Sequence, residues 1–554
     1  NAALKWQRLQ TPAPQVQGDK ALFGVMPDWN PAEIIGTNPG QLAISLYQHL
    51  ILNDIWAIQR AEYGYKDVRP QPLLTQFAGK PYIDIRASFN SFTPKNLSPE
   101  LTQKLINFYL DWLAQHPHLH DKVEFDVVPT CYGPHFSKWE ERLTKHAGLT
   151  QDELSELKAG LFDITQNALS RTQQDLDVLD ELEVRYQAVI DNKNISDKDK
   201  IFLLLENCKT YGTLPFSHLA RSGFVAATFL KEAVLEGWLS TTAQEGFMET
   251  VETVSHELSV DAWLTAQGKK TWEDFVQTYG HLRPGTYDIT SPAYWDDAER
   301  FLKPIVEQAI ESIRQSPKIE QWQQEKPEFF NKLRSLGFKA TDQELENFMT
   351  QAVEGREKAK FIFSKSLSAA LSLIAKEGEA YSLSPQELAN ISLADLQAAF
   401  SSDLPVSNVS ERLKQIVTQN TYERTISHAC QLPPLLTNSN DFSAFVLTAD
   451  KPNFIGSARV TAQAVLLENN DEQQSVAGCI VLIPQADPGY DWLFGQKIAG
   501  LITMYGGANS HMAIRSAEFG LPAAIGIGEQ LYNKVKHAKT LELDAANHTM
   551  KVIH

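Results

Sequence analysis

A glycine pair followed by a histidine at a helix start is the feature of this chain that most restricts its fold. Gly506 and Gly507 lack a β-carbon, so the backbone there can adopt unusual dihedral angles and let a bulky anion approach. Ser510 is a preferred N-cap residue, and the residues after it have helical composition up to Gly520. The pattern predicts a strand, a glycine turn and a helix with His511 in its first turn.

His511 has the chemical properties of a phosphate carrier. Unpaired N–H groups and the helix dipole favour negative charge at a helix N-terminus, and neutral imidazole is a competent nucleophile near neutral pH. The hydroxyl of Thr503 is expected to hold one ring nitrogen and leave the other free to attack. Arg515, one helical turn further on, is expected to pair with phosphate oxygens. The alternative is a structural or capping histidine.

The residues around this motif resemble a known family, the phosphohistidine swivelling domain of phosphoenolpyruvate-utilising enzymes. The resemblance implies that His511 is phosphorylated. Two departures occur: Ala517 stands where the family commonly has an arginine, and residues 537–539 replace its usual acidic-glycine turn. Arg515 is the expected substitute for the missing cation. The resemblance covers about 100 residues and rests on Gly456, 478–483, Asp487-Pro488, Ile502-Thr503, Gly506-Gly507, Ser510-His511, Ala513-Ile514, Glu518, Gly520, Pro522 and Gly526.

Composition describes a globular chain of several domains. With 554 residues, the chain is long enough for about two to four domains. Apolar residues make up 43% and charged residues 21%, and no run of about 18 apolar residues marks a membrane span. The net charge of −18 argues against a nucleic-acid partner, which needs clustered lysine and arginine. The scattered cysteines predict neither disulfides nor zinc, and a cytoplasmic location is expected.

The domain organisation is predicted from changes in pattern along the chain. We expect an α+β multidomain protein, in which a large, predominantly helical acceptor domain precedes a small β/β/α swivelling phosphohistidine domain. Because Asn1 stands where an initiator methionine is expected, the first residues are interpreted as an artificial start and the natural chain as longer. The predicted segments are a lead-in at 1–20, the helical domain at 21–430 with a short β element near 79–92, a hinge linker at 431–457 and the swivelling domain at 458–554.

Three local patterns in the helical domain give specific predictions. Asn38 is expected to cap a helix whose leucines recur at four-residue steps until Gly64. An apolar stripe over 367–374 predicts a core-facing helix that stops at Gly378. Residues 80–86 predict a short strand.

Scattered segments of the helical domain resemble the middle, substrate-binding domain of rifampin phosphotransferase and its phosphoenolpyruvate synthase-like dikinase relatives. This resemblance implies an amino-terminal ATP-grasp domain, absent from these residues, that binds ATP and Mg²⁺ and supplies phosphate to His511. Without that domain, we expect the chain to be inactive alone. Only about 40 residues follow His511, whereas a pyruvate-binding barrel needs about 200 or more. The segments are 28–33, 79–84, 279–292 and 356–361.

Candidates for acceptor binding come from these segments. His281 and Arg283, in a turn flanked by glycine and proline, combine a general base with a phosphate clamp, or else form a buried hydrogen-bonding corner. Arg86 and Tyr82, on the predicted strand, and Trp29 are further candidates, although Arg86 equally suits a structural ion pair.

No metal site is expected within the chain. His116, His118 and His120 have the spacing of a metal-binding strand face, but their polar, proline-containing surroundings indicate a surface loop. His256 begins a pattern similar to a helical zinc site, yet Val260 stands at the second ligand position and cannot coordinate zinc.

Three functions remain open on the sequence alone. The first is an ATP-dependent, dikinase-type phosphotransferase in which His511 relays phosphate to an unidentified small-molecule acceptor. The second is a phosphocarrier or regulatory relay protein that takes phosphate from phosphoenolpyruvate or a partner protein. The third is a non-catalytic binding protein on the same fold. The large helical region favours the first, because a pure carrier needs no acceptor domain.

Overall fold

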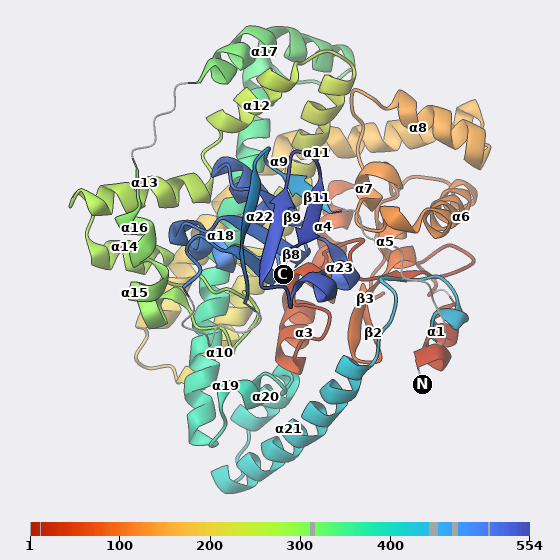
Figure 1. Ribbon diagram of the computed structural model, residues 1–554. Helices are drawn as coiled ribbons and strands as arrows, with labels where there is room; N and C mark the ends of the chain where they lie inside the picture. The colour runs from red at the N-terminus through yellow and green to blue at the C-terminus, as the bar shows by residue number, and fades with distance from the viewer. Residues whose placement is uncertain are drawn as a thin grey trace.

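A long central helix divides the molecule into two sides. The computed structural model describes residues 2–11, 13–310, 316–442, 452–467, 475–507 and 510–553. Helix α18 (Asp342–Ala380) runs through the middle, and the β-rich C-terminal domain lies beside it (Figure 1). Within these described ranges, no helix is both long and apolar enough to cross a membrane.

The chain before residue 430 is mainly helical, as predicted. Its helices are α1 (Ala2–Leu9), α2 (Pro31–Ile34), α3 (Gln41–Tyr47), α4 (Ile55–Tyr63), α5 (Ile85–Ser91), α6 (Pro99–Gln115), α7 (Val123–Asp126), α8 (Ser137–Arg142), α9 (Gln151–Asp191), α10 (Asp197–Cys208), α11 (Leu214–Leu235), α12 (Thr241–Thr250), α13 (Val254–Ala266), α14 (Trp272–Tyr279), α15 (Ala298–Phe301), α16 (Lys303–Glu307), α17 (Pro317–Ser335), α18, α19 (Pro385–Leu388), α20 (Leu393–Phe400) and α21 (Val406–Ala429).

The two longest helices, α9 and α18, begin at matching capping boxes. The Thr150 hydroxyl accepts from the Glu153 N–H while the Thr150 N–H donates to the Glu153 carboxylate at 2.7 Å, and Thr341 and Glu344 repeat the arrangement. Helix α18 packs against α9, α10 and α11. The apolar stripe at 367–374 is buried there, so its prediction as core is confirmed.

Two predicted helix boundaries are wrong. The helix expected after Asn38 begins at Gln41, with Gly40 as its N-cap. It does not continue unbroken to Gly64, because a turn at residues 53–54 separates it from α4, and only α4 ends at Gly64. Gly378 does not stop α18, which continues to Ala380. A β-carbon at Gly378 would lie 2.6 Å from Cδ1 of Leu388, so the glycine is needed for packing and not for termination.

A small antiparallel sheet lies in the helical part of the molecule. It has the order β2-β3-β1-β4, from β1 (Phe23–Gly24), β2 (Leu74–Phe77), β3 (Lys80–Asp84) and β4 (Leu435–Leu436). The predicted strand at 80–86 is therefore confirmed only to Asp84. The Asp84 carboxylate accepts a hydrogen bond from the Ala87 N–H at 3.0 Å and caps α5, which makes Arg86 helical.

The predicted hinge at 431–457 contains strands of both sheets. Strand β4 pairs with β1 in the small sheet, and β5 (Asn453–Ile455) pairs with β9 (Ala523–Ile525) in the C-terminal sheet. The C-terminal domain thus begins before residue 458. The chain passes from one sheet to the other across 443–451, which lie outside the described residues.

The C-terminal domain is built on a mixed, seven-stranded sheet of order β11-β10-β6-β7-β8-β9-β5. Strand β7 buries alternate residues on opposite faces: Ile480 and Leu482 face α23, and Val481 and Ile483 face the other side. The remaining elements are β6 (Arg459–Leu466), β7 (Ile480–Gln485), β8 (Gly500–Tyr505), β9 (Ala523–Ile525), β10 (Thr540–Asp544), β11 (Thr549–Val552), α22 (His511–Glu518) and α23 (Gly528–Val535).

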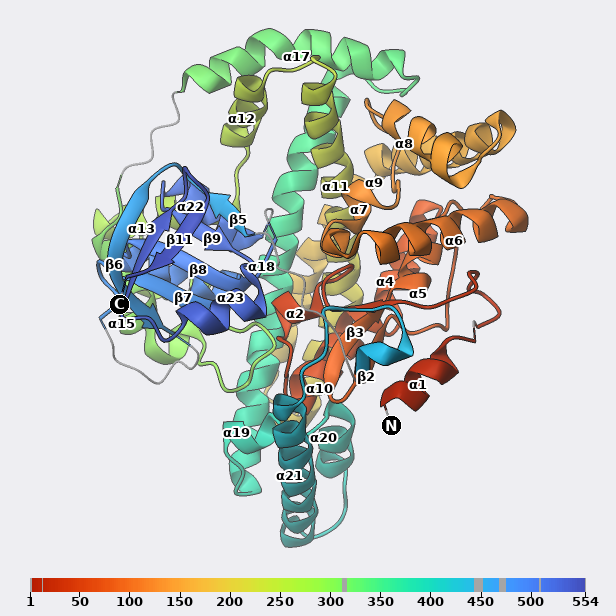
Figure 2. The same ribbon diagram turned by 45° about the vertical axis from the view of Figure 1, so that its right-hand side comes forward.

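One hydrophobic core joins the C-terminal sheet to helices from the middle of the chain. Phe301 of α15 packs on Trp492, and the Tyr294 hydroxyl donates a hydrogen bond to the Gly489 carbonyl at 2.7 Å. Figure 2 shows α13 and α15 beside this sheet, on one side of α18, with α5, α6 and β2 on the other. Residues 254–310 therefore share a core with the C-terminal domain, although the sequence places them in the helical domain.

Candidate functional site

His511 is the first residue of α22 and directly follows the N-cap Ser510. The Ser510 Oγ accepts a hydrogen bond from the Ala513 N–H at 3.4 Å. Since the first N–H groups of a helix have no partner within it, this turn offers donors to an anion. The His511 side chain is 20% exposed, so it is accessible to a reacting molecule.

The two glycines before His511 differ in role. Gly506 has φ of +142°, and a β-carbon there would lie 2.6 Å from Cβ of Ala486, so only glycine fits. No described atom lies within 4 Å of the position that a β-carbon of Gly507 would take. Packing therefore requires Gly506, while the space beside Gly507 suits the approach of a phosphoryl group.

The ring of His511 is held by Asp491, a residue that sequence reasoning missed. His511 Nε2 donates to Asp491 Oδ1 at 2.8 Å. Thr503, the expected partner, instead accepts at Oγ1 from the Gly526 N–H at 2.9 Å and stabilises the glycine turn. Because an ionised carboxylate only accepts hydrogen bonds, Asp491 keeps a proton on Nε2. Asp491 lies in the 3₁₀ segment that follows β7, and no motif in the sequence marked it as a site residue.

Arg515 contacts the same carboxylate. Its Nε lies 3.5 Å from Asp491 Oδ1, and the ring centroids of Phe494 and Phe519 lie 5.6 and 4.6 Å from its guanidinium carbon. Burial alone would raise the pKa of Asp491, but His511 and Arg515 outweigh it and hold the pKa below its usual value. The prediction that Arg515 shares a helix face with His511 is confirmed.

A cavity of about 360 Å³ lies between this domain and the helical body, and His511 is on its wall. The volume is in the range of small-molecule sites, whose walls are mostly apolar with a few polar groups. Here the aromatic part of the wall consists of Trp29, Tyr47, Phe216, Tyr287, Phe361 and Phe363.

Besides Arg283, Glu357 and Asp491, the cavity is lined by two cations, Arg356 and Lys360, and two carboxylates, Glu33 and Asp487. Arg356 and Lys360 lie one turn apart on α18, and in the described part of the chain neither forms an ion pair or a side-chain hydrogen bond. Burial raises the pKa of Glu33 and of Asp487, and Lys360 only partly offsets the effect at each. Sequence reasoning missed all four as site residues, although each lies in a segment quoted for a family resemblance.

Trp29, a candidate for acceptor binding, lies on the cavity wall in a strained stretch of backbone. Trp29 and Asn30 have φ of 53° and 31°, in the left-handed region that residues other than glycine rarely adopt. Hydrogen bonds to the adjacent, buried Asp28 hold this conformation in place. Arg60 donates to the Asp28 carboxylate at 2.8 Å, and the Ser88 hydroxyl donates to it at 2.6 Å. Such strain is typical of functional sites.

His281 and Arg283 reach the cavity but are engaged in holding residues 281–291 to α18. His281 Nε2 donates to the Phe361 carbonyl at 2.9 Å, and burial lowers the His281 pKa to about 3. Arg283 donates to Ser368 at 2.7 Å and to the Ser291 carbonyl at 2.6 Å, and burial lowers its pKa to about 10. The alternative of a buried hydrogen-bonding corner therefore describes both residues.

The structure places Arg86 and Tyr82, two of the residues expected to bind the acceptor, away from this cavity. Arg86 is 2% exposed and donates to the carbonyls of Leu9 and Gln10 at 2.8 and 2.7 Å. The Tyr82 hydroxyl donates to the Pro433 carbonyl at 2.8 Å. Neither residue lines the cavity, because both point into the packing around the small sheet.

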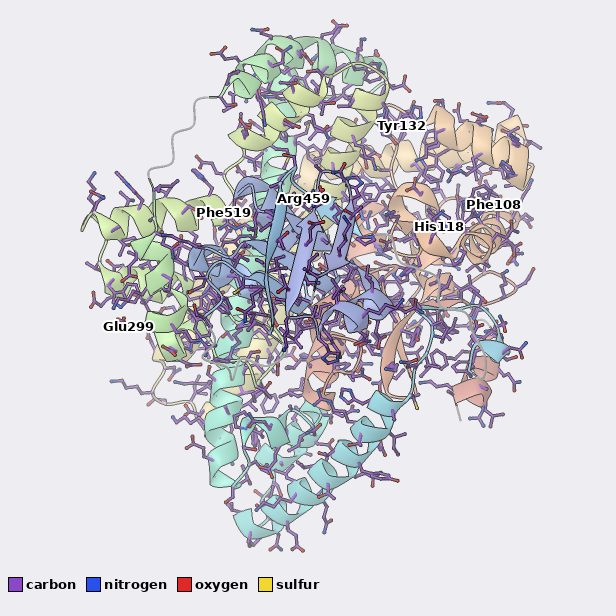
Figure 3. The ribbon with its side chains drawn as sticks, viewed as in Figure 1. Phe108, His118, Tyr132, Glu299, Arg459 and Phe519 are labelled. Carbon is purple, nitrogen blue, oxygen red and sulfur yellow. The ribbon has the colours of Figure 1, made fainter. Side chains whose placement is uncertain are left out.

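The histidine-rich segment stays separate from this site. His116 and His120 each bond through Nδ1 to a backbone carbonyl of their own segment. His118 lies on the α6 side of the molecule, apart from the C-terminal domain (Figure 3). The described side chains include no group of three or more histidine, cysteine or acidic residues arranged to hold a metal ion.

Residues 476–548 match the family of the PEP-utilising enzyme, mobile domain. The match contains Asp487, Asp491, His511 and Arg515, and it supports the family resemblance of the C-terminal domain. It indicates a role in phosphoryl transfer through a phosphohistidine. No curated protein matches the chain. The resemblance of the helical part to rifampin phosphotransferase stays a prediction.

Proposed function

We propose that the protein is a phosphotransferase in which His511 carries a phosphoryl group and transfers it to a hydroxyl group of a small molecule bound in the cavity. The observation that carries this proposal is the position of His511 on the wall of a mainly apolar cavity that is also lined by Arg356 and Lys360, for which the described residues provide no ion pair within 4 Å and no side-chain hydrogen bond. A pure phosphocarrier would present its histidine to another protein on an open surface.

Different residues of the cavity would bind the phosphoryl group, stabilise the phosphohistidine and bind the acceptor. Arg356 and Lys360 would bind the phosphoryl oxygens as negative charge develops on them. The N–H groups of α22 and Arg515 would stabilise the phosphorylated histidine. The aromatic wall, including Trp29, would hold the acceptor and exclude water, which would otherwise compete for the phosphoryl group.

The phosphate donor would bind elsewhere. We propose ATP with Mg²⁺, held by an ATP-grasp domain outside residues 1–554, with phosphoenolpyruvate or a phosphorylated partner protein as the alternative donor. The described side chains do not suit a resident Mg²⁺, because they include no cluster of metal ligands. His511 would meet the donor after the C-terminal domain moves away from the helical body.

A chemical donor tests the histidine without a donor domain. Phosphoramidate phosphorylates reactive histidines, and the product is stable in alkali and labile in acid. We expect label on His511, detected by mass spectrometry of alkali-treated peptides, and none in His511→Ala. His537→Ala is the matched control, since His537 is exposed on the same domain. The labelled protein is then mixed with a panel of alcohols and phenols, and phosphorus NMR detects any phosphate monoester.

The outcomes separate the candidate functions. A monoester formed by the wild type establishes transfer to a small molecule. Label that passes only to a partner protein or back to a phosphocarrier would favour the relay function. Absence of label on His511 from phosphoramidate, ATP and phosphoenolpyruvate alike would leave a binding protein.

A further inference from the structure

Asp487 is a buried carboxylate near His511, and the proposed function assigns it no role. It is 1% exposed, lies on the cavity wall and caps the 3₁₀ segment Pro488–Gln496. The Gly489 N–H donates to Asp487 Oδ1 at 2.8 Å. The Thr286 hydroxyl is 3.5 Å from Oδ1 and 3.4 Å from Oδ2, which makes a weak contact. The backbone thus fixes the carboxylate while Oδ2 keeps its capacity to accept a strong hydrogen bond.

We propose that Asp487 is the general base that takes the proton from the acceptor hydroxyl as the phosphoryl group leaves His511. This inference rests on the proposed function. In the step, the acceptor oxygen forms a bond to phosphorus and the N–P bond breaks, with its electron pair going to the ring. The hydroxyl proton passes to Asp487, and the ring leaves as neutral imidazole because its other nitrogen carries a proton. Solvent later takes the proton from Asp487.

Three other ionisable groups on the wall are less suited to this role. Asp491 is bound to both His511 and Arg515, which hold its pKa low and make it a weak base. His281 donates its Nε2 proton to a backbone carbonyl and has a pKa of about 3. The Glu33 carboxylate accepts from the Asn30 side chain at 3.2 Å, and its charged neighbours are Lys360, Asp487 and Arg356 rather than His511.

The surroundings of Asp487 make its carboxylate a stronger base than an exposed aspartate. Burial raises its pKa, and the nearby Lys360 and His511 only partly offset the effect. A carboxyl group with a raised pKa accepts a proton more readily than an exposed one. The charged or titratable groups that interact with Asp487 are Lys360, His511, Glu33, Tyr287, Tyr294 and Tyr490.

The test compares wild type, Asp487→Asn and Asp297→Asn. Asparagine keeps the oxygen that accepts from Gly489 but cannot take a proton. Asp297 is an exposed cap of α15 and serves as the matched control, because it loses a capping charge away from the cavity. Each protein is phosphorylated on His511 with phosphoramidate, separated from the reagent and mixed with benzyl alcohol over a range of pH. Phosphorus NMR follows benzyl phosphate and inorganic phosphate.

We expect equal labelling of His511 in all three proteins, which shows that the C-terminal domain is folded. Discharge to benzyl alcohol should be about 100-fold slower in Asp487→Asn, the lower range for a general base. The wild-type rate should fall as pH falls through the raised pKa of Asp487, and Asp487→Asn should lack this decline. Asp297→Asn should match the wild type.

Equal rates and equal pH profiles for wild type and Asp487→Asn would overturn the assignment of Asp487. If the wild type does not accept benzyl alcohol, discharge to water is compared in the same way, and equality again overturns it. Failure to label His511 in the wild type would instead remove the proposed function, so the two failures are distinguishable.

Discussion

The two walls of the cavity are built in opposite ways. The wall from the C-terminal domain comes from one stretch, residues 486–514, in which a loop, a strand and a helix start follow one another. The opposite wall combines segments from residues 29–51, 216–220 and 356–368 of the helical body with segments from residues 254–287, which share a core with the C-terminal domain. The first wall contains His511 and is determined by neighbouring residues in the sequence. The second wall, which would bind the proposed acceptor, forms only when segments distant in the sequence pack together.

The arginines of the helical body show a second contrast. Arg86 and Arg283 use their guanidinium groups on backbone carbonyls and hydroxyls, so they stabilise the fold. Arg356, with Lys360 beside it, faces the cavity without such partners among the described residues. A cation with no partner at a cavity wall is available to a ligand, whereas a saturated one is not.

Among the variants that test the difference between these two kinds of cation, Arg356→Ala and Lys360→Ala are expected to have the largest effect on phosphoryl transfer. Each should slow transfer from phosphorylated His511 to an alcohol by about 10²–10³-fold, because one group that stabilises the developing phosphoryl charge is lost. Labelling by phosphoramidate should be unchanged, since His511 lies on the other wall. Single-turnover discharge measures the effect, and Lys358→Ala is the control, because Lys358 is exposed on the same helix. Equal discharge rates for Lys360→Ala and Lys358→Ala would contradict the proposed role.

Arg86→Met should act on stability instead. The carbonyls of Leu9 and Gln10 would lose their buried donor, at a cost of about 2–4 kcal/mol in the free energy of unfolding. Urea denaturation measures this loss. His511 in the folded variant should still be labelled as in the wild type. An Arg86→Met variant that is as stable as the wild type but transfers phosphate more slowly would contradict the assignment of Arg86 to stability and Arg356 to transfer.

Asp491→Asn should make the C-terminal domain less sensitive to acid. The folded-state pKa of Asp491 is depressed, so its stabilisation is complete above the pKa of an unfolded aspartate, about 3.9. That stabilisation is lost as pH falls through the folded-state pKa. Near neutral pH, the variant should lose about 1.5–3 kcal/mol, the value of a hydrogen bond to a charged group. Hydrogen exchange of β7 and β8 amides measures the difference, which should shrink on acidification; a constant difference would argue against the Asp491–His511 pair.

Ser510→Ala should have the smallest effect. Loss of the N-cap hydrogen bond from the Ala513 N–H is expected to destabilise α22 by about 1 kcal/mol. Ser510→Gly should destabilise α22 by only about a few tenths of a kcal/mol. Hydrogen exchange of the α22 amides distinguishes the two variants. Equal destabilisation by alanine and glycine would show that the Ser510 hydroxyl does not act as a cap.

Local chemistry explains which predictions were confirmed. The N-cap role of Ser510, the shared face of His511 and Arg515 and the end of a helical path at Gly64 depend on residues a few positions apart. The prediction for Gly378 was wrong because a distant side chain, Leu388, set the requirement for glycine. The boundary at residue 458 was also wrong, because β5 pairs with a strand far along the chain.

The sequence by itself determined the chemistry of the reacting group: a glycine turn, an N-cap and a histidine at a helix start are consecutive, and their geometry follows from backbone dihedral angles and unpaired N–H groups. Tertiary structure alone decided what that histidine faces. It brought Asp491 to the ring, placed Arg356 and Lys360 across the cavity and turned Arg86 away from it. These contacts join residues distant in the chain, so packing and not local propensity determines them.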